Sequence, residues 1–257
     1  MAENLTFIIK RRNLLYQMVA SDLKAGAKDM MLGYLWWVLD PILLMLIFWI
    51  LIGMIFQRGG PDFPLFVLCG LFPHRAFTVS FSKSVNSLVS AFGVISQIHF
   101  PRIYLALKGV ISNHFKLLFG FIVLILVSII YEKPLGPHLF LLIVPYSIQV
   151  VLISGVAMMM SVLGVYFRDL QNLSQFVARI LMYMSPILYS VERIPERFRD
   201  IYMLNPLASL YVTYRSIIMQ TPINLQYVFI AATQALVVFL TGYLIFAKTE
   251  KSLLKYV

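Results

Sequence analysis

Long apolar runs recur along most of this chain, and they limit its possible folds more than any other feature. Of its 257 residues, 60% are hydrophobic and only 12% are charged, whereas soluble domains usually carry about 25% charged residues. A run of about 20 apolar residues is long enough to cross a bilayer as a helix. The sequence therefore predicts an all-α integral membrane protein.

The runs predict six transmembrane helices and a single transmembrane domain over residues 31–257. The expected spans cover, approximately, residues 34–56, 66–91, 103–131, 139–166, 173–189 and 225–247. A further apolar segment, 201–219, is interrupted by Asn205 and Pro206 and carries Arg215. Counting it as a span would give seven crossings, so we expect a re-entrant hairpin over about residues 199–221, on the outer side. Its non-helical backbone must then be covered by protein or face water.

The distribution of basic residues sets the expected orientation, because cytoplasmic loops of membrane proteins are rich in lysine and arginine. Both ends of the chain are basic and are therefore expected in the cytoplasm, which requires an even number of crossings. Thirteen basic residues fall on the inner side in this arrangement: Lys10, Arg11, Arg12, Lys24, Lys28, Lys83, Arg102, Lys108, Arg168, Arg179, Lys248, Lys251 and Lys255. Five fall on the outer side: Arg58, Lys133, Arg193, Arg197 and Arg199.

Residues 1–30 are expected to form a cytoplasmic leader with an amphipathic helix over Leu5–Leu23. Apolar residues recur there at helical spacing, with basic residues between them. Such a helix can lie in the membrane surface or dock a soluble partner, and a plain solvated basic leader is the third interpretation. The segment has no continuous apolar core, so no cleavable signal peptide is expected.

Polar residues interrupt the first two spans. Asp40-Pro41 lies just inside the first span, where a carboxylate is costly unless it is paired or hydrated. The second span carries His74, Arg75 and Lys83, which favours contact with water or other helices over lipid. We expect a hydrated vestibule at the inner end of these spans.

A short polar stretch, Ser96–Arg102, connects the second and third runs. It is too polar to remain in lipid and too short to be a domain. It is either an ordinary tight loop or a knob through which a soluble partner pushes on the spans. The sequence alone leaves both open.

Several kinds of chemistry have no sequence support. The chain contains no Gly-x-x-x-x-Gly-Lys-Ser/Thr phosphate loop, so it is not expected to hydrolyse ATP itself. The four histidines are dispersed, which gives no support for a metal site. Cys69 is the only cysteine, so no intrachain disulfide can form. The net charge of +10 is scattered among spans, which favours basic cytoplasmic loops over a nucleic-acid surface.

Four segments, in this order, resemble the ABC-2 type permease family, and more particularly membrane subunits of ABC transporters that export O antigen, capsule or teichoic acid. They are Leu32-Gly33-Tyr34-Leu35-Trp36 through Pro41, Phe100-Pro101-Arg102, Tyr166-Phe167-Arg168-Asp169-Leu170 and Leu204-Asn205-Pro206-Leu207. The resemblance implies a homodimer partnered by two ATPase subunits, which bind the ATP and magnesium. This chain then needs no cofactor. The resemblance makes Gln97, Ile98, His99, Phe100, Pro101 and Arg102 the ATPase-coupling helix.

The resemblance further implies a polyprenyl-diphosphate-linked glycan as the substrate, exported across a bacterial plasma membrane. Sugar rings could stack on aromatic side chains, and our candidates for the channel mouth are Tyr34, Trp36 and Trp37. Arg168, beside Asp169, is the candidate contact for the lipid diphosphate, with an ion pair to Asp169 or a lipid phosphate as the alternative. The rival functions are an ABC-2 permease for a drug or small lipid, and a membrane enzyme acting on a lipid-linked sugar.

Overall fold

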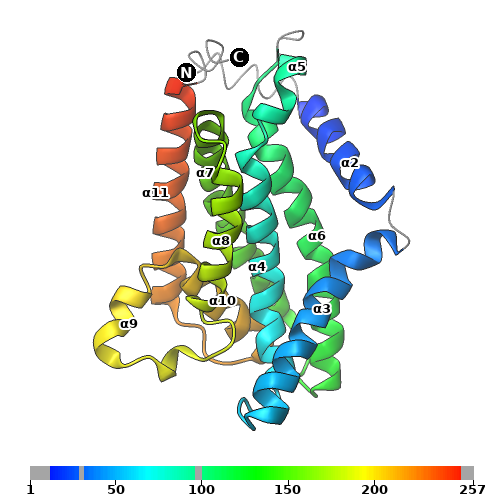
Figure 1. Ribbon diagram of the computed structural model, residues 1–257. Coiled ribbons are helices and arrows are strands. Elements are labelled where there is room, and N and C mark those ends of the chain that lie inside the picture. Colours follow the sequence, from blue (N-terminus) through cyan, green and yellow to red (C-terminus); the bar gives the residue numbers. More distant parts are fainter. Residues whose placement is uncertain (1–11, 29–31, 96–99, 250–257) are drawn as a thin grey trace.

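The computed structural model describes residues 12–28, 32–95 and 100–249, and every regular element in these ranges is helical (Figure 1). We call the end of the bundle with α5 and the Thr249 end of α11 the upper end, as in Figure 1, and the opposite end the lower end. The main helices are α2 (Arg12–Lys28), α3 (Trp36–Phe48), α4 (Phe63–Val85), α6 (Ile103–Ile130), α7 (Ile143–Tyr166), α8 (Leu170–Tyr183), α9 (Glu196–Tyr202), α10 (Pro206–Met219) and α11 (Leu225–Thr249). Shorter elements are η1 (Gly33–Leu35), the π-helical η2 (Trp49–Ile55), η3 (Val89–Ala91), α5 (Phe92–Ile95), η4 (Pro137–Leu142) and η5 (Val191–Arg193).

Five helical segments of the described residues are long and apolar enough to cross a membrane: Gly33–Ile55, Phe63–Val85, Ile103–Ile130, Pro137–Tyr166 and Leu225–Thr249. They match five of the six expected spans. At the expected fifth span, α8 has 14 residues and gives way to turns after Tyr183. Fourteen helical residues extend only about 21 Å, so the count of six crossings stays a prediction.

The segment expected as a re-entrant hairpin consists of two helices, α9 and α10, joined by a short turn. Asn205 begins α10, since its Oδ1 accepts a hydrogen bond from the Leu207 amide at 3.1 Å. Gln220 ends the helix with a left-handed backbone, φ +57°. The helix is largely buried and packs against α4 and α11. At the lower end, the turn before α4 meets the turn after α6, because Lys133 Nζ forms an ion pair with Asp62 Oδ2 at 2.6 Å.

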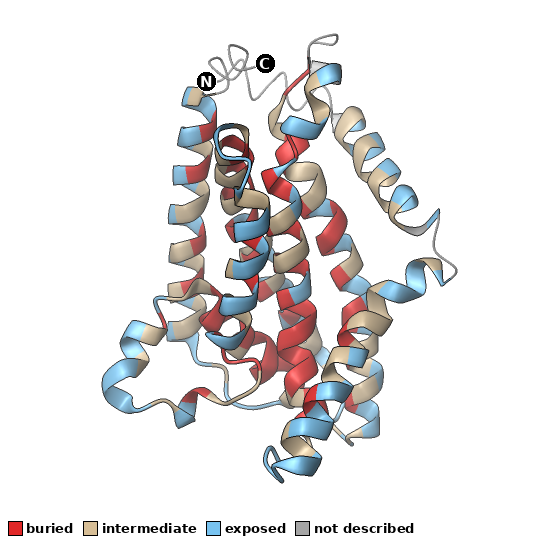
Figure 2. Ribbon diagram, in the orientation of Figure 1, coloured by how far each residue is buried: buried red, intermediate tan, exposed pale blue. Residues whose placement is uncertain are grey.

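The core is built around α4, which lies between α3, α6, α7, α8 and α10. Within the most apolar part of each span, 72% of α4 residues are buried, compared with 17% for the first span and 17% for α11. Figure 2 shows the buried residues concentrated on α4 and α10 toward the lower end. The first span and α11 therefore leave most of their surface to lipid or to another chain.

The helices α7 and α11 approach most closely at two glycines. A Cβ atom on Gly242 would lie 2.2 Å from the Gly155 carbonyl oxygen, and one on Gly155 would lie 2.5 Å from the Val238 carbonyl oxygen. Small residues allow such backbone contact between membrane helices. The two helices are therefore in direct backbone contact at these glycines.

The leader helix α2 packs along α6. Leu14 and Met18 on its apolar face contact the cluster around Phe100, while Tyr16 is 75% exposed. The apolar face of this amphipathic helix thus packs against the chain's own helix α6 and the neighbouring cluster. The division at residue 30 falls in 29–31, outside the described residues.

Candidate functional site

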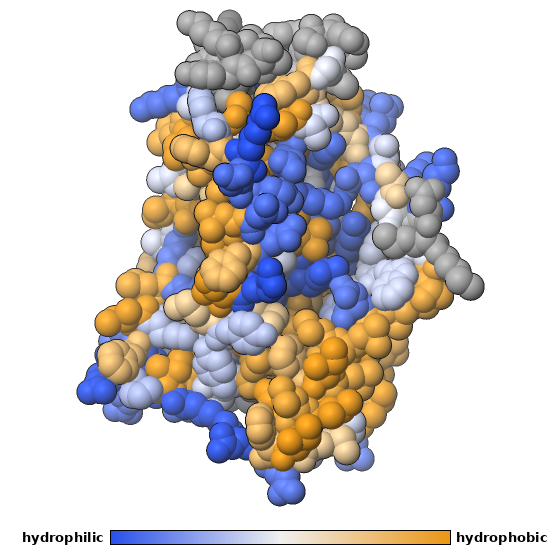
Figure 3. All heavy atoms as spheres, in the orientation of Figure 1, coloured by the Kyte–Doolittle hydropathy of each residue, from blue (hydrophilic) through white to orange (hydrophobic). Residues whose placement is uncertain are grey.

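One face of α4 is polar and open, although the rest of the helix is buried. Arg75, Thr78, Ser82 and Lys83 follow one another at helical spacing, and each is exposed or partly exposed. Asn86, just past the end of α4, continues the row. Figure 3 shows hydrophilic residues gathered in the strip between α8 and α3, with hydrophobic surface on both sides. Charged groups on a membrane-crossing helix face water or protein rather than lipid, so this face is a path for polar material or a contact surface.

The first of two cavities on this face, of about 120 Å³, lies between α3, α4 and α8. An ion pair joins Asp40 of α3 to Arg75 of α4 across it. Of the two possibilities that the sequence left open for Asp40, pairing or hydration, the structure shows pairing. Arg179 of α8 also lines this cavity, so a second guanidinium faces the same space.

His74 and Thr78, which line this cavity, belong to a polar network that reaches α10. The His74 Nδ1 atom is 3.0 Å from the Tyr211 hydroxyl, and its Nε2 atom is 3.1 Å from Thr78 Oγ1. Tyr211 lies on α10 and Thr78 lies on the polar face of α4. The His74 ring therefore connects that face to α10 by hydrogen bonds. No group of metal-ligating residues exists among the residues that the structure describes.

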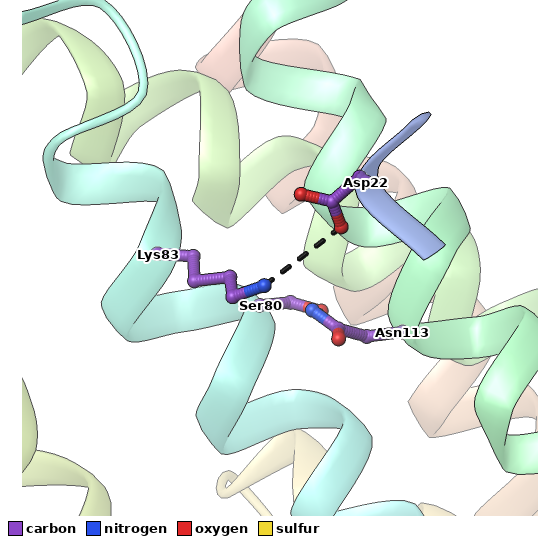
Figure 4. A network of polar contacts seen from close by, with 4 residues as sticks. All are labelled: Asp22, Ser80, Lys83 and Asn113. Atoms are coloured by element: carbon purple, nitrogen blue, oxygen red, sulfur yellow. Dashed lines mark hydrogen bonds and ion pairs between the residues drawn. The ribbon is translucent and has the colours of Figure 1, made fainter. Parts of the chain in front are cut away.

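The second cavity, of about 280 Å³, lies between α2, α3, α4 and α6. Arg75, Lys83 and Lys116 line it together with Trp36 and Trp37. Figure 4 shows Lys83 directed toward Asp22 of α2, at 3.8 Å, with Ser80 and Asn113 beside it. The Asn113 amide donates a hydrogen bond to Ser80 Oγ at 3.2 Å.

The aromatic residues expected at a channel mouth lie at this second cavity. Trp36 and Trp37 line it, and Tyr34 packs edge-on against Trp37 with ring centroids 4.8 Å apart. Lys116 Nζ lies 4.9 Å from the Trp37 ring centroid, within the range of a cation–π interaction. The structure thus groups these residues, and their role at a mouth stays a prediction.

Arg168 and Asp169 lie elsewhere, in the connection between α7 and α8. Both are exposed, and neither lines the two cavities described above. Within the described part of the chain they form no ion pair with each other. The expected contact with a lipid diphosphate is therefore untested by this geometry.

Of the expected coupling segment, Gln97, Ile98 and His99 lie outside the described residues. Phe100 is 8% exposed and packs among Leu88, Leu105 and Phe246, and Pro101 is also buried. Phe100 thus faces the chain's own helices, whereas Arg102 is partly exposed. If this segment docks a partner, Phe100 holds it to α6, α7 and α11 and to the turn that follows α4.

Asn205 and Arg215 fix the region between α8 and α10. Asn205 Nδ2 donates to Ser185 Oγ at 3.0 Å, and Pro206 opens α10. Arg215, itself 8% exposed, donates to the carbonyl oxygens of Phe66, Pro186 and Ile187. The sequence flagged Asn205 and Pro206 as a break in an apolar segment. It did not show that Arg215 holds this break against α4.

Sequence reasoning also missed Lys116, and it counted Arg179 only as an inner charge. The available signal was a cation inside an apolar run, which marks a functional position by default in a membrane helix. These features define a multi-pass membrane protein with a charged, open face on its central span.

Comparison with known proteins identifies the family within this class of membrane proteins. The model of the ABC-2 type transporter family matches residues 13–219, and the chain therefore belongs to this family. It is 30% identical over 239 residues to an O-antigen export system permease protein, RfbA, of Klebsiella pneumoniae, covering 93% of this chain and 92% of the relative. An RfbA of Myxococcus xanthus is 26% identical, covering 80% of each chain. The polysialic acid transport protein KpsM of Escherichia coli is 26% identical, covering 73% of this chain and 74% of the relative.

Proposed function

We propose that this chain is the permease subunit of an ABC exporter that moves a polyprenyl-linked polysaccharide across the bacterial plasma membrane. The observation that carries the proposal is the charged, open face of α4 in a chain whose relatives bear the names of O-antigen and polysialic acid transport proteins. A glycan needs a hydrated path through the bilayer, and this face supplies polar groups for one.

The path needs a second copy of the chain, because one copy leaves the face open on one side. In our proposal two permeases face each other as a homodimer, and α8 with the turns after it makes the sixth crossing. The helices α9 and α10 re-enter from the outer side, and both termini are cytoplasmic.

The energy for transport comes from ATP hydrolysis in two separate ATPase subunits, which bind the ATP and magnesium. This sequence itself has no phosphate loop. Residues 97–102 dock into them. Closure of the ATPases moves this segment, and α4 and α6 on either side of it transmit the movement to the path. At the inner face, Arg168 contacts the diphosphate of the arriving lipid-linked glycan.

The test reconstitutes the purified permease with its ATPase in proteoliposomes and measures ATP hydrolysis with and without lipid-linked polysaccharide. Stimulation by the lipid-linked glycan, and not by the lipid alone, is the expected result. Stimulation by a small lipid or drug alone would replace the proposal with the small-substrate permease. Turnover of a lipid-linked sugar by the permease without any ATPase would replace it with the membrane enzyme.

Docking is tested in the same preparation by charge reversal. Arg102→Glu should lower recovery of the ATPase on a tagged permease, because Arg102 is partly exposed at the proposed contact. Arg58→Glu, at an exposed turn near Asp62 at the lower end, is the matched control and should not. Equal recovery in both variants would assign docking to another segment.

A further inference from the structure

The cavity between α2, α3, α4 and α6 brings three cations from two helices into one small space. Arg75 and Lys83 come from α4, and Lys116 comes from α6. Their side chains line a volume of about 280 Å³, with Trp36, Trp37 and Asn113 completing the polar and aromatic part of the wall. Cations repel one another when they are brought together in a membrane protein, so this arrangement needs a source of negative charge.

The chain's own carboxylates compensate the three cations only in part. Asp40 pairs with Arg75. Asp22 lies 3.8 Å from Lys83, and its Oδ2 atom is buried without a hydrogen-bond partner among the described residues. Lys116 has the Trp37 ring at 4.9 Å and forms no ion pair with a described residue. Three cations thus face two carboxylates, and one of the two ion pairs is loose.

We propose that this cavity binds the phosphate group of a lipid head group. A phosphate or diphosphate presents several strong acceptor oxygens, which suit one guanidinium, two ammonium groups and the Asn113 amide. The indole of Trp36 and the side chains of Phe72 and Leu117 offer an apolar wall for the carbon atoms next to the phosphate. As a site for the exporter's lipid-linked substrate, it rests on the proposed function. As an anion site, it rests on the geometry alone.

The site works by exchange. An incoming phosphate takes the place of Asp40 on Arg75 and of Asp22 on Lys83. Asp40 lies on α3, a span that is only 17% buried, and Asp22 lies on α2. Binding therefore loosens two links that hold α2 and α3 to α4. The exchange predicts opposite effects: removing a cation weakens anion binding, and removing a competing carboxylate strengthens it.

The test measures anion binding to the purified full-length permease by intrinsic tryptophan fluorescence. The chain has three tryptophans, and two of them line the cavity, so a Trp49→Phe background confines the signal to the site. The probes are farnesyl diphosphate, inorganic diphosphate, and phosphatidylglycerol in mixed detergent micelles, which contain no tryptophan. The variants are Lys83→Gln with Lys116→Gln, Asp40→Asn alone, and Lys108→Gln as the control, since Lys108 also lies on α6 but outside the cavity.

We expect the double lysine variant to bind the best probe about tenfold or more weakly, since each lost charge-assisted contact weakens binding. Asp40→Asn should bind it more tightly, and Lys108→Gln should match the background. Tighter binding in one variant cannot arise from misfolding, and thermal unfolding of each variant checks the fold. Equal affinity in the background and the double variant, or equal weakening by Lys108→Gln, overturns the site.

The probe that binds best identifies the source of the phosphate. Preference for farnesyl diphosphate over inorganic diphosphate supports a lipid-linked diphosphate, and preference for phosphatidylglycerol supports a bilayer phospholipid. Preference for inorganic diphosphate overturns the assignment to a lipid. Because no ATPase or glycan enters this experiment, anion binding in the absence of glycan-stimulated ATP hydrolysis would keep the site and reject only the exporter.

Discussion

At the scale of single residues, two buried side chains, Phe100 and Arg215, each hold one segment of the bundle in place. Phe100 anchors the segment expected to couple to the ATPase, and Arg215 anchors the segment expected near the outer surface. One does so by apolar packing and the other by hydrogen bonds to backbone carbonyls. Replacing Phe100 should therefore remove apolar packing, whereas replacing Arg215 should leave backbone carbonyls without a hydrogen-bond donor.

Phe100→Ala should lower the free energy of unfolding by about 3 kcal/mol, because it empties a position in a packed cluster. Chemical unfolding in detergent, followed by circular dichroism, measures the loss. Phe198→Ala, at a position that is 48% exposed on α9, is the control and should change stability little. A loss of equal size in the control would mean that Phe100 carries no special share of the packing.

Arg215→Ala should destabilise the chain by about 3 kcal/mol, since the carbonyls of Phe66, Pro186 and Ile187 lose their shared donor while they stay enclosed. Thermal unfolding measures the effect. Arg197→Ala removes the same charge from an exposed side chain and should be nearly neutral. Wild-type stability of Arg215→Ala would show that water replaces the guanidinium at no cost.

At the scale of elements, the helices differ in how firmly they are held. The pair α7 and α11 is in backbone contact through Gly155 and Gly242, while the first span is largely uncovered. We therefore expect any movement driven by a partner to occur in α2 and α3 more readily than in the pair α7 and α11, which the glycine contact holds together.

Gly242→Ala should destabilise the pair strongly, because the new Cβ would overlap the Gly155 carbonyl oxygen. We expect a loss of about 2 kcal/mol, as for other overpacked positions. Gly109→Ala is the matched control: its Cβ meets nothing within 4 Å, so the change should be neutral or stabilising. Thermal unfolding of both variants separates backbone contact from a general effect of replacing helical glycines.

At the scale of the whole molecule, the polar face of α4 and the apolar surfaces around it must meet different solvents. One chain exposes both, as Figure 3 shows, and the water-filled path that we propose within a bilayer would accommodate both. The dimer that we propose would place the charged face of α4 along the shared path and leave the apolar surface of the first span to lipid.

Water access to the two surfaces gives a direct test in a Cys69→Ala background, which is free of other thiols. Ser82→Cys on the polar face should react with a water-soluble maleimide at least about tenfold faster than Ile122→Cys, because thiolate formation and reagent access both need water. Ile122 is 56% exposed on α6 in one chain, so lipid rather than burial would protect it. Similar rates of maleimide reaction at both positions would contradict a hydrated path along α4.

The sequence predicted what depends on composition and local spacing. It located five spans of crossing length, the break at Asn205 and Pro206, and the need of Asp40 for either a partner or water. It could not identify Arg75 as the partner of Asp40, nor place Lys116 in one cavity with Lys83, because these residues lie on α3, α4 and α6, far apart in the sequence. It also gave no sign that Phe100 faces inward, since an aromatic residue in a short connection fits docking and anchoring equally well.

The position of Arg75 along α4 has an electrical consequence. From Phe63 to His74 the helix is enclosed by protein almost without a break, and this stretch extends roughly 18 Å up to Arg75. Beyond it lies the open face, which water fills in the path that we propose. In a bilayer the membrane voltage falls across material that excludes water, so nearly all of it falls along the half of α4 that begins at Phe63. The field there would be about 1.7 times as steep as across a uniform hydrocarbon core about 30 Å thick. Arg75 stands at the boundary, where any displacement of its charge along the helix performs electrical work.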